Sequence, residues 1–140
     1  MKVDFYIFEQ ASEEKTRRFA CQCIETAYHE QKQIFLYVDN HEEAERMDKL
    51  LWIFRDDSFL PHQLYHASDH SRAPILIGYD KSIVAHHDVV VNLSKKIPPY
   101  EQFDHVIEII FSDIIVQQLA RERYRFYRDH NCIINVQKIN

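Results

Sequence analysis

IFLYV, residues 34–38, is a run of apolar and aromatic residues with no charged or amide side chain among them. A strand with water on one face alternates apolar and polar residues, whereas a strand covered on both faces is apolar throughout. We therefore predict a strand over 34–38 that is buried on both faces. Asn40 and Glu43 follow at the spacing of a capping box with Asn as the N-cap, which predicts a helix through about Trp52.

A strand followed by a helix is also predicted in the N-terminal segment. VDFYIF, residues 3–8, is a short apolar and aromatic run typical of a strand. Ser12 is suited to cap a helix, and Glu13 and Glu14 follow it where negative charge favours the helix dipole. This helix is expected to end at about residue 30. Strand, helix, strand, helix at this pace predicts an α/β fold with a parallel sheet.

The C-terminal half repeats these elements after an irregular segment, 55–74. Three further strands are predicted, at 75–79, 88–93 and 105–111. A helix is predicted from Asp113 to about His130, and Asn131 tolerates the left-handed backbone that ends many helices. No repeat, linker or low-complexity tract interrupts the chain, so we predict one Rossmann-like domain over 1–140, with a mostly parallel sheet flanked by helices.

The composition excludes several classes of function. The chain has 140 residues, a formal net charge of -5, three cysteines and a single glycine, Gly78. Loops that bind nucleotide phosphates need several glycines, so we expect no nucleotide-binding glycine loop and no cofactor. No apolar run approaches the ~20 residues of a membrane span, and the N-terminus has no features of a signal peptide. We expect a reduced, cytoplasmic protein.

QQLARERYRFYRDHN, residues 117–131, places a basic and aromatic segment in this acidic chain. Residues at 100° intervals separate into two faces. The predicted core face has Ile115, Leu119 and Phe126 on one line, with Val116 and Tyr127 beside it. The opposite sector, of about 100°, has Arg121, Tyr124, Arg125 and Arg128. Arg123 lies at the edge of the apolar face, where we expect it to extend to solvent or pair with a carboxylate.

Two interpretations of the basic sector stay open from its composition. It can be an ordinary solvated helix face. It can also be an anion-binding site, because arginine grips carboxylates and phosphates bidentately and stacks on rings. The anion would then be an acidic peptide or a nucleic-acid backbone. The negative net charge favours the peptide, since non-specific binding to nucleic acid needs a broadly basic face.

Four sequence blocks resemble the chi subunit of bacterial DNA polymerase III: LARERYRFYR (119–128), MDKLLW (47–52), SFLPH (58–62) and the AP-x-x-I block from Ala73. The resemblance covers essentially the whole chain. It implies a Rossmann-like fold without a working nucleotide site and a replication accessory without catalytic activity of its own. In that family the subunit connects the clamp loader to single-stranded DNA-binding protein by holding that protein's acidic C-terminal tail.

The resemblance also implies which residues act. The tail-binding positions are Arg121, Tyr124, Arg125 and Arg128, with Ile110 contributing apolar surface. Trp52 and Phe59 match positions that receive the psi subunit of the clamp loader, or a helicase-like partner in some relatives. Without the resemblance, these two aromatic residues would be interpreted as a helix end and loop that fold into the core.

The sequence supports a catalytic or metal site less well than it supports a binding site. His66, Asp69 and His70 have helical spacing, and His86, His87 and Asp88 are adjacent, but we expect both groups to be exposed surface without metal. Cys21 and Cys23 lack the spacing of a zinc or redox pair and are expected to be core or half-buried. No catalytic residue is predicted. The rival functions are direct binding of single-stranded nucleic acid by the Arg-rich helix and a small hydrolase on a Rossmann-like scaffold.

Overall fold

The computed structural model describes residues 1–9, 12–55, 59–65, 73–79, 86–111 and 114–139. These residues form a seven-stranded sheet with strand order β3-β4-β2-β5-β6-β1-β7, in which every paired strand is parallel. The strands are β1 (Lys2–Phe8), β2 (Ile34–Tyr37), β3 (His62–Leu64), β4 (Ile75–Gly78), β5 (Val89–Asn92), β6 (His105–Phe111) and β7 (Ile133–Ile139). The helices are α1 (Glu13–His29), α2 (His41–Ile53), the short 3-10 helix η1 (Tyr100–Gln102) and α3 (Ile114–Asp129).

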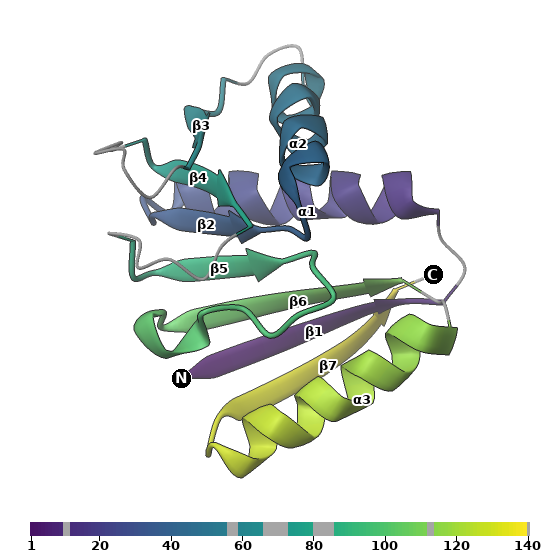
Figure 1. The fold of residues 1–140 in the computed structure, drawn as a ribbon. Coiled ribbons are helices and arrows are strands. Elements are labelled where there is room, and N and C mark those ends of the chain that lie inside the picture. Colours follow the sequence, from purple (N-terminus) through teal and green to yellow (C-terminus); the bar gives the residue numbers. More distant parts are fainter. Residues whose placement is uncertain (10–11, 56–58, 66–72, 80–85, 112–113, 140) are drawn as a thin grey trace.

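The helices divide between the two faces of the sheet (Figure 1). Residues of α1 and α2 pack into one apolar cluster, whose sheet residues include Ile34, Leu36 and Ile77. Residues of α3 pack into a second cluster on the opposite face, which includes Phe5, Phe35 and other strand residues. The prediction of a Rossmann-like α/β fold with a sheet flanked by helices is therefore confirmed.

Strand β2 is buried as its composition predicts. All four of its residues are buried, and it pairs with β4 on one side and β5 on the other. A strand in this position has helices or loops on both faces, which explains why IFLYV has no alternation.

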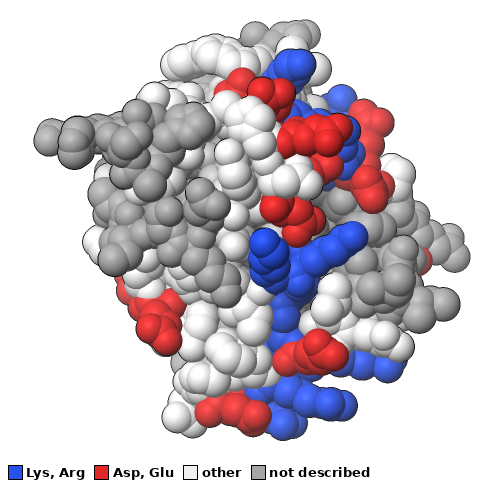
Figure 2. Space-filling model, in the orientation of Figure 1, with Lys and Arg blue, Asp and Glu red and all other residues white. Residues whose placement is uncertain are grey.

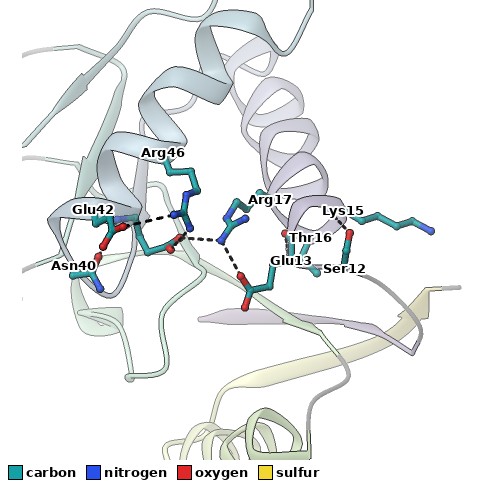
Figure 3. Close-up of polar contacts among 9 residues, drawn as sticks. Ser12, Glu13, Lys15, Thr16, Arg17, Asn40, Glu42 and Arg46 are labelled. Carbon is teal, nitrogen blue, oxygen red and sulfur yellow. Dashed lines mark hydrogen bonds and ion pairs between the residues drawn. The ribbon is translucent and has the colours of Figure 1, made fainter.

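The two predicted N-caps are present (Figure 3). The side chain of Ser12 accepts a hydrogen bond from the backbone N–H of Lys15 at 3.3 Å, and Asn40 accepts one from Glu43 at 2.9 Å. Each such cap contributes about 1 kcal/mol to helix stability. Arg17 of α1 contacts Glu13 at 3.0 Å and Glu43 of α2 at 3.4 Å, so the first turns of the two helices are tied together.

Glycine 78 has a packing role. A Cβ atom built at this position would lie 2.8 Å from the ring of Phe35, closer than two carbon atoms can approach without movement. The residue is in strand β4, so the single glycine lies within the sheet and forms no part of a phosphate-binding turn.

Two strands were not predicted. β3 has three residues and lies in the segment 55–74 that we described as irregular. β7 pairs with β1 along seven residues, and its sequence, IINVQKI, mixes exposed apolar and polar side chains without a clean alternation. β7 follows α3 directly and completes a third strand-helix-strand unit.

Candidate functional site

The buried side of α3 is carried by Ala120, Arg123 and Tyr127. Tyr127 has no exposed surface, and Ala120 and Arg123 are 8% and 4% exposed. Leu119 and Phe126, which we placed at the centre of the core face, are only partly buried. The helix is therefore rotated from the predicted orientation, and its buried side is centred near Arg123 and Tyr127. The side chains of residues 115 and 116 lie outside the described part.

A buried polar network holds this side of α3 on the sheet. Glu108 of β6 has no exposed surface. Its carboxylate lies 3.3 Å from Nε of Arg123 and accepts hydrogen bonds from the Tyr127 hydroxyl at 2.7 Å and the Asn92 amide at 2.9 Å. Burial raises the pKa of Glu108, and Arg123, Tyr127 and Asn92 act in the opposite direction. The predicted pairing of Arg123 with a carboxylate is confirmed.

This network fixes which residues of α3 face the solvent. Arg121, Arg125 and Arg128 are exposed, and Tyr124 is 39% exposed. We call these four residues the Arg face. Figure 2 shows several Lys and Arg side chains over the α3 region in the lower part of the view, with a few Asp and Glu between them.

The arginines of the Arg face differ from those of α1 and α2. Arg17, Arg18 and Arg46 each contact a glutamate within 4.0 Å. Among the described residues, by contrast, no carboxylate pairs with Arg121 or Arg125, and Arg128 has only its neighbour Asp129, at 3.4 Å. Arg121 and Arg125 thus present guanidinium groups without partners in the part of the chain that the structure describes, which leaves their hydrogen-bond donors available to an anion.

Tyr124 gives the Arg face an apolar component. Its ring lies 6.0 Å from that of Phe5, between ring centroids, and the Phe5 ring in turn lies 5.9 Å from that of Tyr127. One side of Tyr124 is therefore supported by the core while the rest of the ring is accessible.

Ile110 requires a correction. It has no exposed surface and belongs to the core cluster beneath α3. The prediction that it contributes apolar surface to the site is wrong for this structure, because β6 lies between β5 and β1 with α3 packed against it.

A second exposed surface lies at the C-terminal end of α2. Trp52, Ile53 and Phe59 are 55%, 69% and 65% exposed. The rings of Trp52 and Phe59 are 5.5 Å apart, and Trp52 lies 4.8 Å from the ring of His62. We call Trp52, Ile53 and Phe59 the aromatic patch. Its exposure excludes a simple core role for Trp52 and Phe59. Ile53 was missed, since a single aliphatic residue at a helix end has no signal that distinguishes exposed from buried.

His62 packs against Trp52 of the aromatic patch. Its side chain has no exposed surface, and its Nδ1 lies 2.6 Å from the backbone oxygen of Leu60. Its Nε2 lies 3.1 Å from the backbone oxygen of Asp48 and 3.2 Å from the Asp48 carboxylate. The imidazole therefore joins β3 to the end of α2, and its ring contacts Trp52 at an interplanar angle of 59°.

The histidine and cysteine groups show no metal site among the described residues. His86 is 1% exposed and donates to the backbone oxygen of Ala73 at 2.8 Å, so the expectation that it lies on the surface is wrong. The group of His66, Asp69 and His70 lies outside the described residues. Cys21 is buried and Cys23 partly buried, as predicted, and burial is the largest cause that raises the pKa of each thiol to about 12.

A cavity of about 610 Å³ lies beside α3, between the segment 97–102 and the rings of Phe126 and His130. None of the Arg face residues lines it. Nothing in the sequence indicated this cavity.

None of the helices in the described ranges has the length and apolar character of a membrane-spanning segment.

The fold defines a class, the α/β proteins with a parallel Rossmann-like sheet, here without a phosphate-binding glycine loop. Residues 1–135 match the family described as DNA polymerase III chi subunit, HolC, and the chain belongs to this family.

Relatives of known identity agree with this assignment. The DNA polymerase III subunit chi of Pseudomonas aeruginosa is 30% identical over 129 residues, which cover 91% of this chain and 89% of that protein. The chi subunit of Escherichia coli is 26% identical over 113 residues, with 79% and 77% covered. Among solved structures, the crystal structure of T4 UvsW aligns over 99% of this chain and 41% of its own, with a TM-score of 0.71 at 8% identity. That likeness concerns the fold alone.

Proposed function

We propose that this chain is a non-catalytic replication accessory subunit that binds the acidic C-terminal tail of single-stranded DNA-binding protein through the Arg face. The observation that carries the proposal is the contrast between the arginines of α1 and α2, which have glutamate partners, and Arg121 and Arg125, which have none among the described residues. Membership of the chi family supports the role in the polymerase III complex.

The chemistry of the Arg face suits such a tail. Exposed guanidinium groups can donate charge-assisted, bidentate hydrogen bonds to aspartates and to a terminal carboxylate. The accessible part of Tyr124 can pack against the apolar end of the tail. The contact is small and mostly exposed, so we expect micromolar affinity that weakens as salt screens the charges.

Fluorescence anisotropy tests this proposal. A labelled acidic peptide that ends in Asp-Ile-Pro-Phe is titrated with the wild type, with Arg121→Ala and with Arg18→Ala. Arg18 is a matched control, because it is an exposed helical arginine on α1 that pairs with Glu14 at 3.5 Å. We expect Arg121→Ala to weaken binding at least tenfold, about 1.4 kcal/mol, and Arg18→Ala to leave it unchanged. Absence of binding to the wild type at about 100 μM would reject the proposal.

Direct binding of single-stranded nucleic acid is the second candidate for the same residues. The aromatic ring among arginines favours it, since bases stack on such platforms. The net charge of -5 disfavours it. Titration with a single-stranded oligonucleotide separates the two, because a nucleic-acid binder would respond without any partner protein and with a steep dependence on salt.

For the aromatic patch we propose a contact with a partner subunit. Exposed, clustered aromatic residues are enriched at protein interfaces, where they become the most strongly buried contacts. The psi subunit of the clamp loader, or a helicase-like protein, is the partner that the resemblance to the chi family implies. In this arrangement the chain links the clamp loader to single-stranded DNA-binding protein.

A further inference from the structure

Strand β7 offers the apolar surface that Ile110 does not. In the parallel pair of β1 and β7, Val136 lies opposite Phe5. Paired residues on neighbouring strands point to the same face of a sheet, so Val136 lies on the face covered by α3. The Phe5 ring contacts Tyr124, and Val136 is 50% exposed. Tyr124 and Val136 are therefore two accessible apolar side chains beside the buried ring of Phe5, on the face of the sheet that α3 covers.

The outer edge of β7 has backbone groups that face away from the sheet. β7 is the last strand of the sheet order. The N–H of Ile133 donates to Met1, and the C=O of Ile139 accepts from Glu9, so the odd-numbered residues turn their backbone toward β1. Successive residues of a strand alternate in this respect. Ile134, Val136 and Lys138 therefore turn their N–H and C=O groups outward.

Such an edge can accept another strand. Proteins usually guard edges by making them short, charged or bulged, but β7 extends over seven residues and Lys138 is its only charged side chain. A second copy of this chain is a poorer occupant, because its own β7, IINVQKI, carries no acidic residue to complement the Arg face. An acidic peptide has the complementary charge, and strand addition is a common mode of peptide recognition.

We propose that the acidic tail binds in extended form along the outer edge of β7 as an added strand, with its terminal apolar ring on Val136 and Tyr124 and its carboxylates on the Arg face. The inference rests on the proposed function and identifies the second half of the same site. It makes Val136 a specificity-determining residue, and it assigns the backbone of Ile134, Val136 and Lys138 a direct role in binding.

Amide hydrogen exchange followed by NMR, with the tail peptide at saturation, tests this arrangement. We expect the amides of Ile134, Val136 and Lys138 to exchange at least tenfold more slowly with peptide than without it. The amides of Ile133 and Asn135, already directed at β1, serve as internal references. Protection of the three outward amides without peptide, increasing with protein concentration, would place a second copy on the edge and overturn the proposal.

A substitution and a modified peptide separate backbone from side-chain effects. Val136→Pro removes one outward N–H together with the valine side chain, and proline is tolerated on edge strands where the N–H faces solvent. Val136→Ala shortens the same side chain but keeps the N–H. We expect the proline variant to bind the peptide about tenfold more weakly than the alanine variant, the effect of one hydrogen bond of ordinary strength. Ile133→Thr is the control, since Ile133 is 69% exposed on the other face of β7. Peptides N-methylated at single positions provide the same test without changing the protein, and at least one of them should bind about tenfold less tightly.

The outcomes distinguish this inference from the proposed function. If the unmodified peptide binds but the three amides exchange as before, and every N-methylated peptide binds equally well, strand addition is wrong and the Arg face alone holds the tail. If the peptide does not bind the wild type at all, both proposals fail.

Discussion

Arginine has two roles on α3, and they are decided by position on the helix. Arg123 is 4% exposed and lies against the buried Glu108. Arg121 and Arg125, two positions away in each direction, are exposed. A buried ion pair loses solvation that its mutual attraction must offset, so its main contribution is to fix the geometry. At this site the geometry that it fixes is the rotation of α3, and hence the direction of the Arg face.

Removal of Arg123 should therefore be costly to the fold. We expect Arg123→Ala to lower the free energy of unfolding by about 3–5 kcal/mol, because it leaves the Glu108 carboxylate buried without its positive partner. The double variant Glu108→Leu/Arg123→Met should lose much less than the sum of the single variants. Urea denaturation of the wild type, Glu108→Leu, Arg123→Met and the double variant measures the coupling, and the same measurement on Arg123→Ala gives the cost of removing the arginine alone. Arg125→Ala, an exposed neighbour, should stay within about 0.5 kcal/mol of the wild type. Additive losses in the cycle would contradict the coupling.

The buried thiols predict a dependence of stability on pH. The pKa of Cys21 and that of Cys23 are raised to about 12, with burial as the largest cause. The folded state therefore favours the neutral thiols, and unfolding releases them to their ordinary pKa of 9.0. The sign follows from this difference: the contribution to stability is complete below pH 9 and is lost as the pH rises toward 12. Urea midpoints measured across this interval should fall. The variant Cys21→Ala/Cys23→Ala should show a shallower fall, and an unchanged slope would contradict the assignment to the thiols.

The end of α1 carries a backbone strain that a single substitution should relieve. Gln31 has a φ of 63°, and Asn131 after α3 has a φ of 62°. Asparagine tolerates this left-handed region, as we predicted for position 131, whereas glutamine is disfavoured there. We expect Gln31→Gly to raise the free energy of unfolding by about 0.5–1 kcal/mol. Gln22→Gly within α1, the matched control, should lower it by about 1 kcal/mol. Thermal denaturation measures both, and equal losses would contradict the interpretation of Gln31.

The sequence of α3 predicts two faces but not how the helix sits on the sheet. The Arg face is exposed as the 100° spacing predicts, because charged groups without partners are solvated more favourably than they are buried. The buried side was centred on Leu119 and Phe126 because apolar residues usually identify it. Its actual centre is polar, at Arg123 and Tyr127, and depends on Glu108 of β6. A contact between residues so distant in sequence has no local signal.

The edge strand β7 was likewise difficult to predict from its sequence. The strand propensity of IINVQKI is appreciable, but its burial alternates weakly because solvent reaches most of its side chains. That same exposure is what leaves its outer backbone groups available. The solvent exposure of β7 therefore explains both why its sequence did not predict a strand and why its edge is a candidate binding site.

Across the whole molecule, the alternation of strands and helices determined the fold class, whereas the order of strands could not be predicted. Parallel strands can be connected in several orders with equal local propensities, and the choice depends on packing between segments such as β1 and β6, which pair although about one hundred residues separate them. The face of the sheet on which each helix lies also could not be predicted from local sequence. In the fold, α3 lies on one face of the sheet and α2 on the other (Figure 1).

Placement on opposite faces predicts that the two surfaces act independently. Phe59→Ala should weaken binding of a partner subunit while it changes the melting temperature by less than about 2 °C, because Phe59 is 65% exposed. Affinity for the tail peptide should be the same in Phe59→Ala and in the wild type, since distant sites without shared contacts are additive. Differential scanning fluorimetry and anisotropy measure the two effects. Unfolding of Phe59→Ala would indicate a structural role.

We propose the Arg face as the site that recognises the tail of single-stranded DNA-binding protein, and the proposed function of this chain depends on that contact. Isothermal titration calorimetry of this chain against that protein, intact and without its acidic tail, tests it most directly. We predict micromolar binding of the intact protein, no detectable binding of the truncated one, and a loss for the double variant Arg121→Ala/Arg125→Ala as large as the loss from truncation. Equal affinity for the intact and truncated proteins would contradict the account.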